Sequence, residues 1–298
     1  MNDYVFSVIL GIIEGLAEFI PVSSTAHLRI AEALLRPGIL TNPYWKMYTI
    51  VIQLGAILCL PIYFRSRIAK FLTTFPGGER GDRTILTHPL SLTIIAFVIT
   101  AIPAYLLTKI IGKHLESLQI IGTSLLVGGI VMWIVDAMNA RWEAAGPGAP
   151  GSRIHTWHME DISLLQAIWI GACQILSAVF PGTSRSMSTI TAGQLAGMSR
   201  AAALEFSFFV SIPTMAAATL YDLLKSLTGK GENPIGVSQI DPHGWIVLAI
   251  GFVVSFIVAY FSVAWFMAWV RRRGFAPFAV YRIVVGILVL VFAARLAG

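Results

Sequence analysis

Six apolar stretches of 20 or more residues dominate this chain and restrict it to one kind of fold. A helix of about 20 apolar residues is long enough to cross the roughly 30 Å hydrocarbon core of a bilayer. Within that core, only helices and closed barrels satisfy all of their backbone hydrogen bonds. The spans are expected at 45–64, 89–111, 118–138, 200–221, 245–270 and 275–296. The sequence therefore predicts an all-α polytopic membrane protein.

The composition supports this fold class and excludes several functions. Of the 298 residues, 56% are hydrophobic and 12% are charged, whereas a soluble domain carries about 25% charged residues. The net charge of +6 is explained by basic cytoplasmic loops rather than by nucleic-acid binding. Cys59 and Cys173 lie in apolar stretches and are expected as packed core residues without a disulfide. We expect bilayer lipid around the chain and no nucleic-acid partner; the sequence does not determine the oligomeric state.

A polar motif interrupts the first apolar segment. Residues 14–27 read Glu-Gly-Leu-Ala-Glu-Phe-Ile-Pro-Val-Ser-Ser-Thr-Ala-His. Glu14 and Glu18 are four apart and share one helix face. The proline disfavours helix just before it, and a new helix can begin with Ser23 or Ser24 as its N-cap. Because a helix N-terminus binds anions and ionisable groups at membrane depth are usually functional, this motif is the candidate site.

The motif occurs twice. The second copy, residues 173–188, contains Phe-Pro-Gly-Thr-Ser-Arg-Ser and carries Arg185 where the first copy has Thr25. Apolar spans follow both copies in the same order, which indicates an internal duplication. A shift of 160 positions places Gly11 on Gly171, Glu14 on Gln174, Pro21 on Pro181 and Ser24 on Ser184.

The duplication predicts two inverted repeats. A helix over residues 24–35 would reach only about 18 Å at ~1.5 Å per residue, too short to cross the bilayer. Each motif is therefore expected in a re-entrant helical hairpin followed by three transmembrane helices. Three is odd, so the halves insert upside down relative to each other and their hairpin turns meet near the midplane. The expected divisions are a first repeat at 1–138 with its hairpin at 4–35, a linker at 139–161, and a second repeat at 162–298 with its hairpin at 162–196.

Loop charges predict the orientation. Eleven lysines and arginines fall on one side of the predicted topology, including the triplet Arg271–Arg273, against eight on the other, including Lys109, Lys113 and Lys230. The positive-inside rule places the first group in the cytoplasm. The first hairpin would then open to the outer face.

The two turns together would create a site for a phosphorylated lipid. Arg185 would face Glu14, Glu18, Ser24 and His27, and its planar fork suits phosphate oxygens. A carboxylate pair repels an anion unless a divalent cation or protons intervene. The residues therefore indicate either a metal ion bridging Glu14, Glu18 and the phosphates, or protonated carboxyl groups.

These motifs resemble the undecaprenyl-diphosphate phosphatases of the BacA/UppP type. The likeness covers nearly the whole chain and includes Val-Ile-Gln-Leu-Gly at 51–55, Glu-Phe-Ser-Phe at 205–208 and Phe-Ala-Val-Tyr-Arg at 278–282. It implies a bacterial inner-membrane enzyme that removes the terminal phosphate of undecaprenyl diphosphate. Recycling of this carrier lipid serves cell-wall synthesis and gives bacitracin resistance. The resemblance also implies dependence on a divalent cation, Mg²⁺ or Ca²⁺.

The resemblance assigns roles to five residues. By position, Glu14 and Glu18 match the acidic pair, Ser24 the nucleophilic or phosphate-binding serine, His27 the motif histidine and Arg185 the phosphate-binding arginine. Ser24 would form a phosphoserine or orient an attacking water. His27 would protonate the leaving phosphate, gate the site or merely line the helix. The remaining candidates for substrate binding are Ser23, Thr25, Gln53, Thr183, Ser184 and Ser186.

Three further expectations concern an alternative function and two other positions. Inverted repeats are transporter architecture, so a lipid-phosphate flippase is the alternative; a nucleophile beside a phosphate-suited arginine favours hydrolysis. Thr49 departs from the family pattern, in which many relatives have glutamate. Arg282, inside the last span, needs a partner or water, and we expect it in a structural ion pair.

Overall fold

The computed structural model describes residues 2–36, 39, 42–111, 117–228 and 240–297. Its regular secondary structure is helical in these ranges, apart from an isolated β-bridge between Thr156 and Met198. Six of the described helices are long and apolar enough to cross a membrane, which confirms the all-α polytopic fold. They are α3 (Pro43–Tyr63), α5 (Pro89–Ile111), α6 (Leu118–Ala145), α9 (Arg200–Leu227), α10 (Pro242–Arg273) and α11 (Ala276–Ala297).

Shorter helices form around the two motifs and in the connections. Around the motifs lie α1 (Asp3–Ala17), α2 (Ser24–Leu35), α7 (Leu164–Val179) and α8 (Arg185–Leu195). The sequence did not predict α4 (Arg65–Thr73) or the 3₁₀ turn η2 (Met159–Asp161). Helix α6 continues through 139–145, the first part of the predicted linker. Lys113 and Lys230 of the charge count lie outside the described residues.

The chain divides into two compact units that do not follow the two sequence halves. The first unit comprises Met1–Phe19, Ser24–Tyr63 and Ser211–Ala264. The second comprises Ile20–Ser23, Phe64–Val210 and Trp265–Gly298. Each unit thus combines segments from both halves, and α9 and α10 contribute one end to each. The inverted orientation of the repeats stays a prediction.

Close helix packing organises the first unit. Helix α1 lies against α10 through Gly15, where an added Cβ would be 2.7 Å from Val258 Cβ. Helix α3 approaches α10 through Gly55, where a Cβ would be 2.6 Å from the Phe252 carbonyl oxygen. Small residues permit such contact between membrane helices. These glycines let α1, α3 and α10 pack with their backbones in contact.

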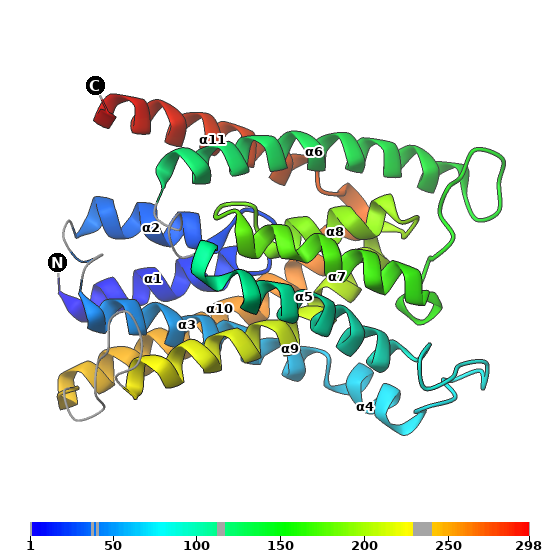
Figure 1. Cartoon of the computed structure of the whole chain (residues 1–298), viewed down its shortest axis with the longest axis horizontal. Coiled ribbons are helices and arrows are strands. Elements are labelled where there is room, and N and C mark those ends of the chain that lie inside the picture. The colour runs from blue at the N-terminus through cyan, green and yellow to red at the C-terminus, as the bar shows by residue number, and fades with distance from the viewer. Residues whose placement is uncertain (1, 37–38, 40–41, 112–116, 229–239, 298) are drawn as a thin grey trace. The chain divides into compact units, whose positions relative to one another are not determined.

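The second unit shows a matching arrangement. Helices α6 and α11 run side by side (Figure 1). Helix α7 lies against α5 at Gly171, where an added Cβ would be 2.6 Å from the Ala96 carbonyl oxygen. Gly11 of α1, the partner of Gly171 in the predicted duplication, lies in the same close fashion against Gly251 of α10. In each unit, the helix before the motif turn (α1 or α7) therefore packs on the second span of the other sequence half (α10 or α5). Duplicated halves would pack in this way.

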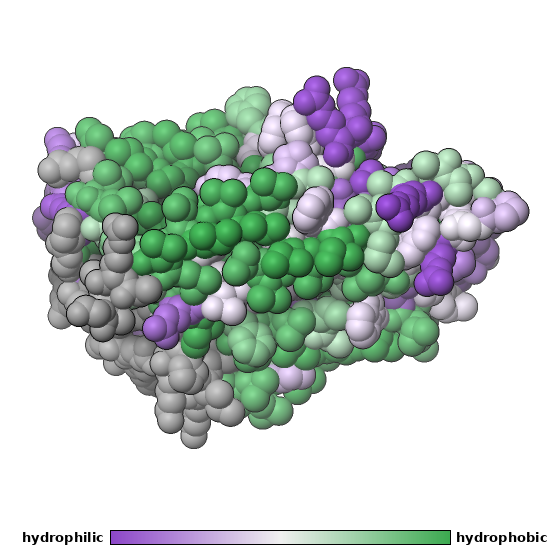
Figure 2. Space-filling model, turned by 90° about the horizontal axis from the view of Figure 1, so that it is seen from above, coloured by the Kyte–Doolittle hydropathy of each residue, from purple (hydrophilic) through white to green (hydrophobic). Residues whose placement is uncertain are grey.

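The surface of the spans suits a lipid environment. Apolar side chains cover much of the face seen in Figure 2. Large hydrophobic side chains are exposed on several spans, such as Leu106, Phe261 and Leu288. Apolar surface of this extent is typical of proteins that contact membranes or partners.

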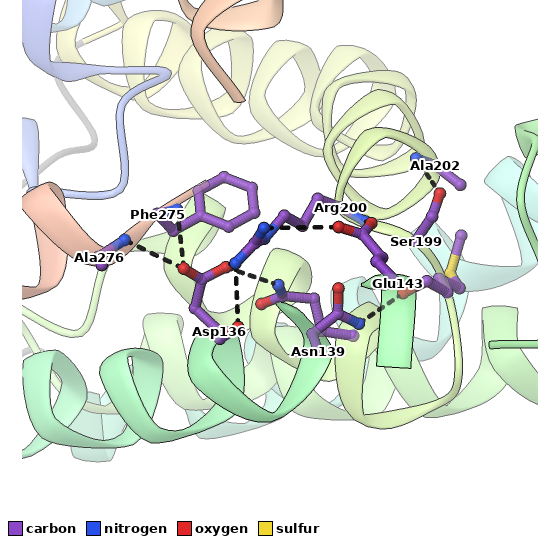
Figure 3. Close-up of polar contacts among 10 residues, drawn as sticks. Asp136, Asn139, Glu143, Ser199, Arg200, Ala202, Phe275 and Ala276 are labelled. Carbon is purple, nitrogen blue, oxygen red and sulfur yellow. Dashed lines mark hydrogen bonds and ion pairs between the residues drawn. The ribbon is translucent and has the colours of Figure 1, made fainter. Parts of the chain in front are cut away.

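A buried charge cluster fixes the start of α11 (Figure 3). Asp136 of α6 is 1% exposed, and one of its carboxylate oxygens accepts hydrogen bonds from the backbone N–H groups of Phe275 (3.1 Å) and Ala276 (3.2 Å). Its other oxygen accepts a 2.7 Å hydrogen bond from Arg200 Nε. An acidic group at a helix N-terminus satisfies free N–H groups and complements the dipole. Asp136 therefore sets the position of α11 on α6.

Candidate active site

A serine and a glutamate are hydrogen-bonded across the break between α1 and α2. Helix α1 ends at Ala17 with Glu18 as its C-cap, and α2 begins at Ser24. The Ser24 hydroxyl donates a 2.6 Å hydrogen bond to Glu18 Oε2, and both residues are buried. A hydroxyl aimed at a carboxylate is the arrangement that activates a nucleophile. This pair is the chemical centre of the first unit.

Glu14 is the second carboxylate of the motif and is fully buried. It lies close enough to Glu18 for the two carboxyl groups to interact electrostatically. A hydrogen bond between them needs a shared proton; with both ionised, neither Glu14 oxygen has a donor in the described part of the chain. Buried carboxylate oxygens of this kind are the ligands that Mg²⁺ and Ca²⁺ prefer. The pair therefore fits a divalent cation.

The described residues do not surround such a cation by themselves. They contain no group of three or more histidine, cysteine, aspartate or glutamate side chains placed to hold a metal ion. Magnesium is commonly bound by one or two carboxylates together with water and substrate phosphates. A cation at Glu14 and Glu18 would therefore complete its shell from water or substrate.

A cavity of about 150 Å³ is lined by Glu14 and Ser24 but not by Glu18. This volume is roughly ten times what one water molecule needs, so a small anionic group fits. The cavity lies within the first unit, and its walls come from α1, α2 and α3. It is lined by Glu14, Ser24, Thr25, Leu28, Arg29, Glu32, Thr49, Ile50 and Gln53.

The cavity contains several predicted site residues, two residues that the sequence reasoning missed, and Thr49, which it noted only as a departure from the family pattern. Thr25 and Gln53 line it as predicted substrate-binding candidates, whereas His27 of α2 is not among the lining residues. Arg29, Glu32 and Thr49 also line it. The spacing of 25, 29 and 32 along one helical face could have indicated the first two of these.

The two motif turns have the same backbone at a serine. Ser23 and Ser184 are the non-glycine residues with positive φ in the described ranges, at 73° and 69°. Each directly precedes a helix, which begins at Ser24 or at Arg185. The predicted match of Ser24 with Ser184 is therefore wrong at this point, because the second turn contains one more residue; Arg185 corresponds to Ser24. Strained serines of this kind cluster at functional sites.

Arg282 links the two turns within the second unit. It is fully buried, and its guanidinium donates to the carbonyl oxygens of Pro21 (3.1 Å), Gly182 (3.1 Å) and Thr183 (2.9 Å). A further hydrogen bond reaches the Ser124 carbonyl oxygen. The expected ion pair is wrong: backbone carbonyl groups are the partners of this arginine. Arg282 thus holds the predicted turns together by their backbones.

The predicted site residues fall into both units. Glu14, Glu18, Ser24, Thr25, His27 and Gln53 belong to the first unit. Ser23, Thr183, Ser184, Arg185 and Ser186 belong to the second. Their union in one site stays a prediction from the sequence.

A larger cavity of about 230 Å³ lies elsewhere in the second unit, around the connection between α4 and α5. Its basic residues are already paired: Arg80 donates to Asp161 (3.1 Å), and Arg83 lies 3.7 Å from the same carboxylate. Partial burial alone would raise the pKa of the lining residue Glu160, but the hydrogen bond and charge of Arg67 outweigh it and lower that pKa. This cavity contains no pair of nucleophile and base comparable to Ser24 and Glu18, so we assign the chemistry to the smaller one.

The fold and the site define a polytopic helical membrane protein with a buried serine–carboxylate pair, whose serine lines a cavity. Residues 7–288 match the family model described as "Bacitracin resistance protein BacA", and the chain belongs to this family. A protein of Koribacter versatilis (strain Ellin345), named undecaprenyl-diphosphatase, is 67% identical over 297 residues, which cover 99% of this chain and all of that protein. A Sorangium cellulosum protein of the same name is 41% identical, covering 95% and 84% of the two chains. The resemblance seen in the motifs is confirmed.

Proposed function

We propose that this chain is an undecaprenyl-diphosphatase, which converts undecaprenyl diphosphate and water to undecaprenyl phosphate and phosphate. Family membership and the names of its relatives support the substrate and the reaction. The observation that carries the proposal in the structure is the 2.6 Å hydrogen bond from Ser24 to Glu18 beside the cavity.

The reaction we propose has two steps. Glu18 accepts the hydroxyl proton while Ser24 Oγ attacks the terminal phosphorus, and the bond from that phosphorus to the bridging oxygen breaks. Undecaprenyl phosphate leaves, and the terminal phosphoryl group stays on Ser24. Water then attacks the phosphorus of the phosphoserine, and the bond from that phosphorus to Ser24 Oγ breaks. Phosphate leaves with the protons of the water, and Glu18 returns its proton to Ser24 Oγ. If Ser24 only orients water, the same bond breaks in one step, with Glu18 as the base for that water.

The other residues serve the same chemistry. Glu14 and Glu18 would hold a divalent cation, which neutralises charge on phosphate oxygens. Arg185 would bind phosphate through its planar fork. His27 would supply a proton to the departing group or control access to the site.

We further propose that the enzyme lies in the bacterial inner membrane with its site open to the outer face. The basic triplet Arg271–Arg273 at the end of α10 supports a cytoplasmic location for that end. Spent diphosphate carrier would then be hydrolysed where wall polymerisation leaves it.

Phosphate release by purified protein in detergent tests this function. We expect stoichiometric phosphate and undecaprenyl phosphate from undecaprenyl diphosphate, and loss of turnover with a chelator of divalent cations. Movement of lipid across proteoliposomes without phosphate release would favour the flippase instead.

A further inference from the structure

The cavity in the first unit is lined by more negative than positive side chains, which is unfavourable for an anionic substrate. Two lining carboxylates, Glu14 and Glu32, are 0% and 4% exposed. Like charges at such short range in a buried site repel a phosphate strongly. Arg29 is the one basic side chain among the residues that line the cavity. Electrostatic attraction for an anion within this cavity therefore depends on Arg29.

Arg29 is held only loosely in the described structure. Its Nη1 lies 3.7 Å from Glu32 Oε2, one helical turn away. This separation exceeds that of a hydrogen bond between an arginine and a carboxylate, about 2.7–2.9 Å. No hydrogen bond joins the Arg29 guanidinium to another described residue. Its side chain is 31% exposed, against 5% for that of Glu32. The guanidinium donors therefore remain available for a ligand.

A ligand for these donors is also indicated by the part of the cavity wall that α1 contributes. Glu14 lines the same cavity, is fully buried, and its ionised oxygens lack a donor in the described part of the chain. A bound group must bring positive charge or protons to Glu14 while presenting acceptor oxygens to Arg29. A phosphate group accompanied by a divalent cation has both properties.

We propose that Arg29 binds a phosphate group of the substrate in this cavity and that Glu32 is the competing partner, which Arg29 leaves when the phosphate binds. This inference rests on the proposed function. In the absence of substrate, Glu32 keeps the guanidinium at the cavity wall. On binding, the fork of Arg29 turns to the phosphate oxygens. Because Arg29 and Ser24 line one cavity, the phosphate is held beside the hydroxyl that attacks it.

Arg36, directly after the helix that carries Arg29, provides a matched control. It follows the end of α2 and pairs with Asp3, and its guanidinium lies 5.7 Å from the Trp45 ring centre. It does not line the cavity. A loss of positive charge at Arg36 changes the net charge equally but leaves the cavity unchanged.

The test compares Arg29→Gln, Arg29→Lys, Glu32→Gln and Arg36→Gln. For Arg29→Gln, we expect KM for undecaprenyl diphosphate and Ki for inorganic phosphate to rise about tenfold or more. An increase of this size corresponds to the loss of a charge-assisted hydrogen bond. The kcat should change less than either constant. Arg29→Lys should recover part of the affinity for phosphate, because lysine keeps the positive charge. The recovery should be incomplete, because a point charge replaces the fork. Glu32→Gln should leave the phosphate Ki unchanged or lower, and Arg36→Gln should keep both constants.

Wild-type KM and Ki in the Arg29→Gln variant would overturn the inference, as would equal increases for Arg36→Gln. Thermal unfolding of each variant identifies a merely structural loss, which would lower activity without shifting the Ki for phosphate. An inactive wild-type protein would instead contradict the proposed function. In that case, calorimetric titration of wild type and Arg29→Gln with pyrophosphate and Mg²⁺ still decides the inference, which predicts weaker binding by the variant.

Discussion

The Ser24 hydroxyl and the Glu18 carboxylate form a 2.6 Å hydrogen bond, although a proline-containing turn separates the two residues. Glu18 caps the end of α1, and Ser24 begins α2. Neither residue could reach the other if one continuous helix joined them, because positions six apart lie on different faces. The break at the motif is therefore what creates the pair of base and nucleophile.

Glu18→Gln should lower kcat more than Glu14→Gln. An amide at position 18 cannot accept the serine proton, and loss of a general base costs about 10²–10⁴-fold. Glu14 makes no hydrogen bond to Ser24, so its replacement at saturating cation should cost less. Initial rates at high Mg²⁺ measure the difference. Equal losses would mean that both carboxylates act only as one cation site.

Glu14→Gln should instead raise the cation concentration needed for half-maximal activity. A neutral amide is a weaker ligand for a hard divalent cation than a carboxylate. We expect an increase of about tenfold or more, read from phosphate release during Mg²⁺ titration. Gln174, the residue at the corresponding position of the second motif, offers a control, since Gln174→Ala removes no charge. An unchanged Mg²⁺ requirement in Glu14→Gln would remove Glu14 from the cation site.

Arg185→Ala should abolish turnover while the protein remains folded, and Arg185→Lys should also be severely impaired. The expectation comes from the motif and from the fork geometry that phosphate prefers. Near wild-type kcat for Arg185→Lys in a detergent assay would show that bidentate contact is unnecessary.

The sequence was sufficient for the helical spans and for the motif residues Glu14, Glu18 and Ser24, because length, hydropathy and the proline break are local properties. The spacing of Thr25, Arg29 and Glu32 places them on one face of α2, but the sequence could not reveal that this face lines the cavity, since this depends on how α2 packs beside α3. It also could not identify the partners of Arg282: backbone carbonyl groups are present at every residue and carry no sequence signal. The correspondence of Ser23 with Ser184 in the two motif turns was missed, because a left-handed backbone conformation is uncommon at serine.

Arg282→Leu should destabilise the protein and lower activity together. It leaves buried carbonyl groups at both turns unpaired, at about 1–3 kcal/mol for each. Thermal unfolding in detergent should show a lower Tm. Arg282→Lys has three donors instead of a fork, so its Tm should lie between those of Arg282→Leu and the wild type. An unchanged Tm in Arg282→Leu would mean that the turns are held by other contacts.

Single cysteines at Asn42 and Ala149 should label differently in a background without Cys59 and Cys173, both of which are free thiols. If the site opens outward, a membrane-impermeant thiol reagent on intact cells, with any outer membrane permeabilised, should modify position 42 and spare 149. Lysed cells provide the control, in which both positions should react. Labelling of 149 alone would reverse the proposed orientation while leaving the enzymatic function intact.

The role of Ser24 is tested most directly by phosphate release from undecaprenyl diphosphate, measured for wild-type protein and for Ser24→Ala purified in the same detergent. The wild type should release one phosphate for each undecaprenyl phosphate formed. Ser24→Ala should lose at least about 10²-fold in kcat, since the nucleophile or its water-orienting hydroxyl is gone. Its Tm should stay close to that of wild type. A Ser24→Ala variant with wild-type kcat would contradict the assignment of Ser24 and Glu18 as the reacting pair.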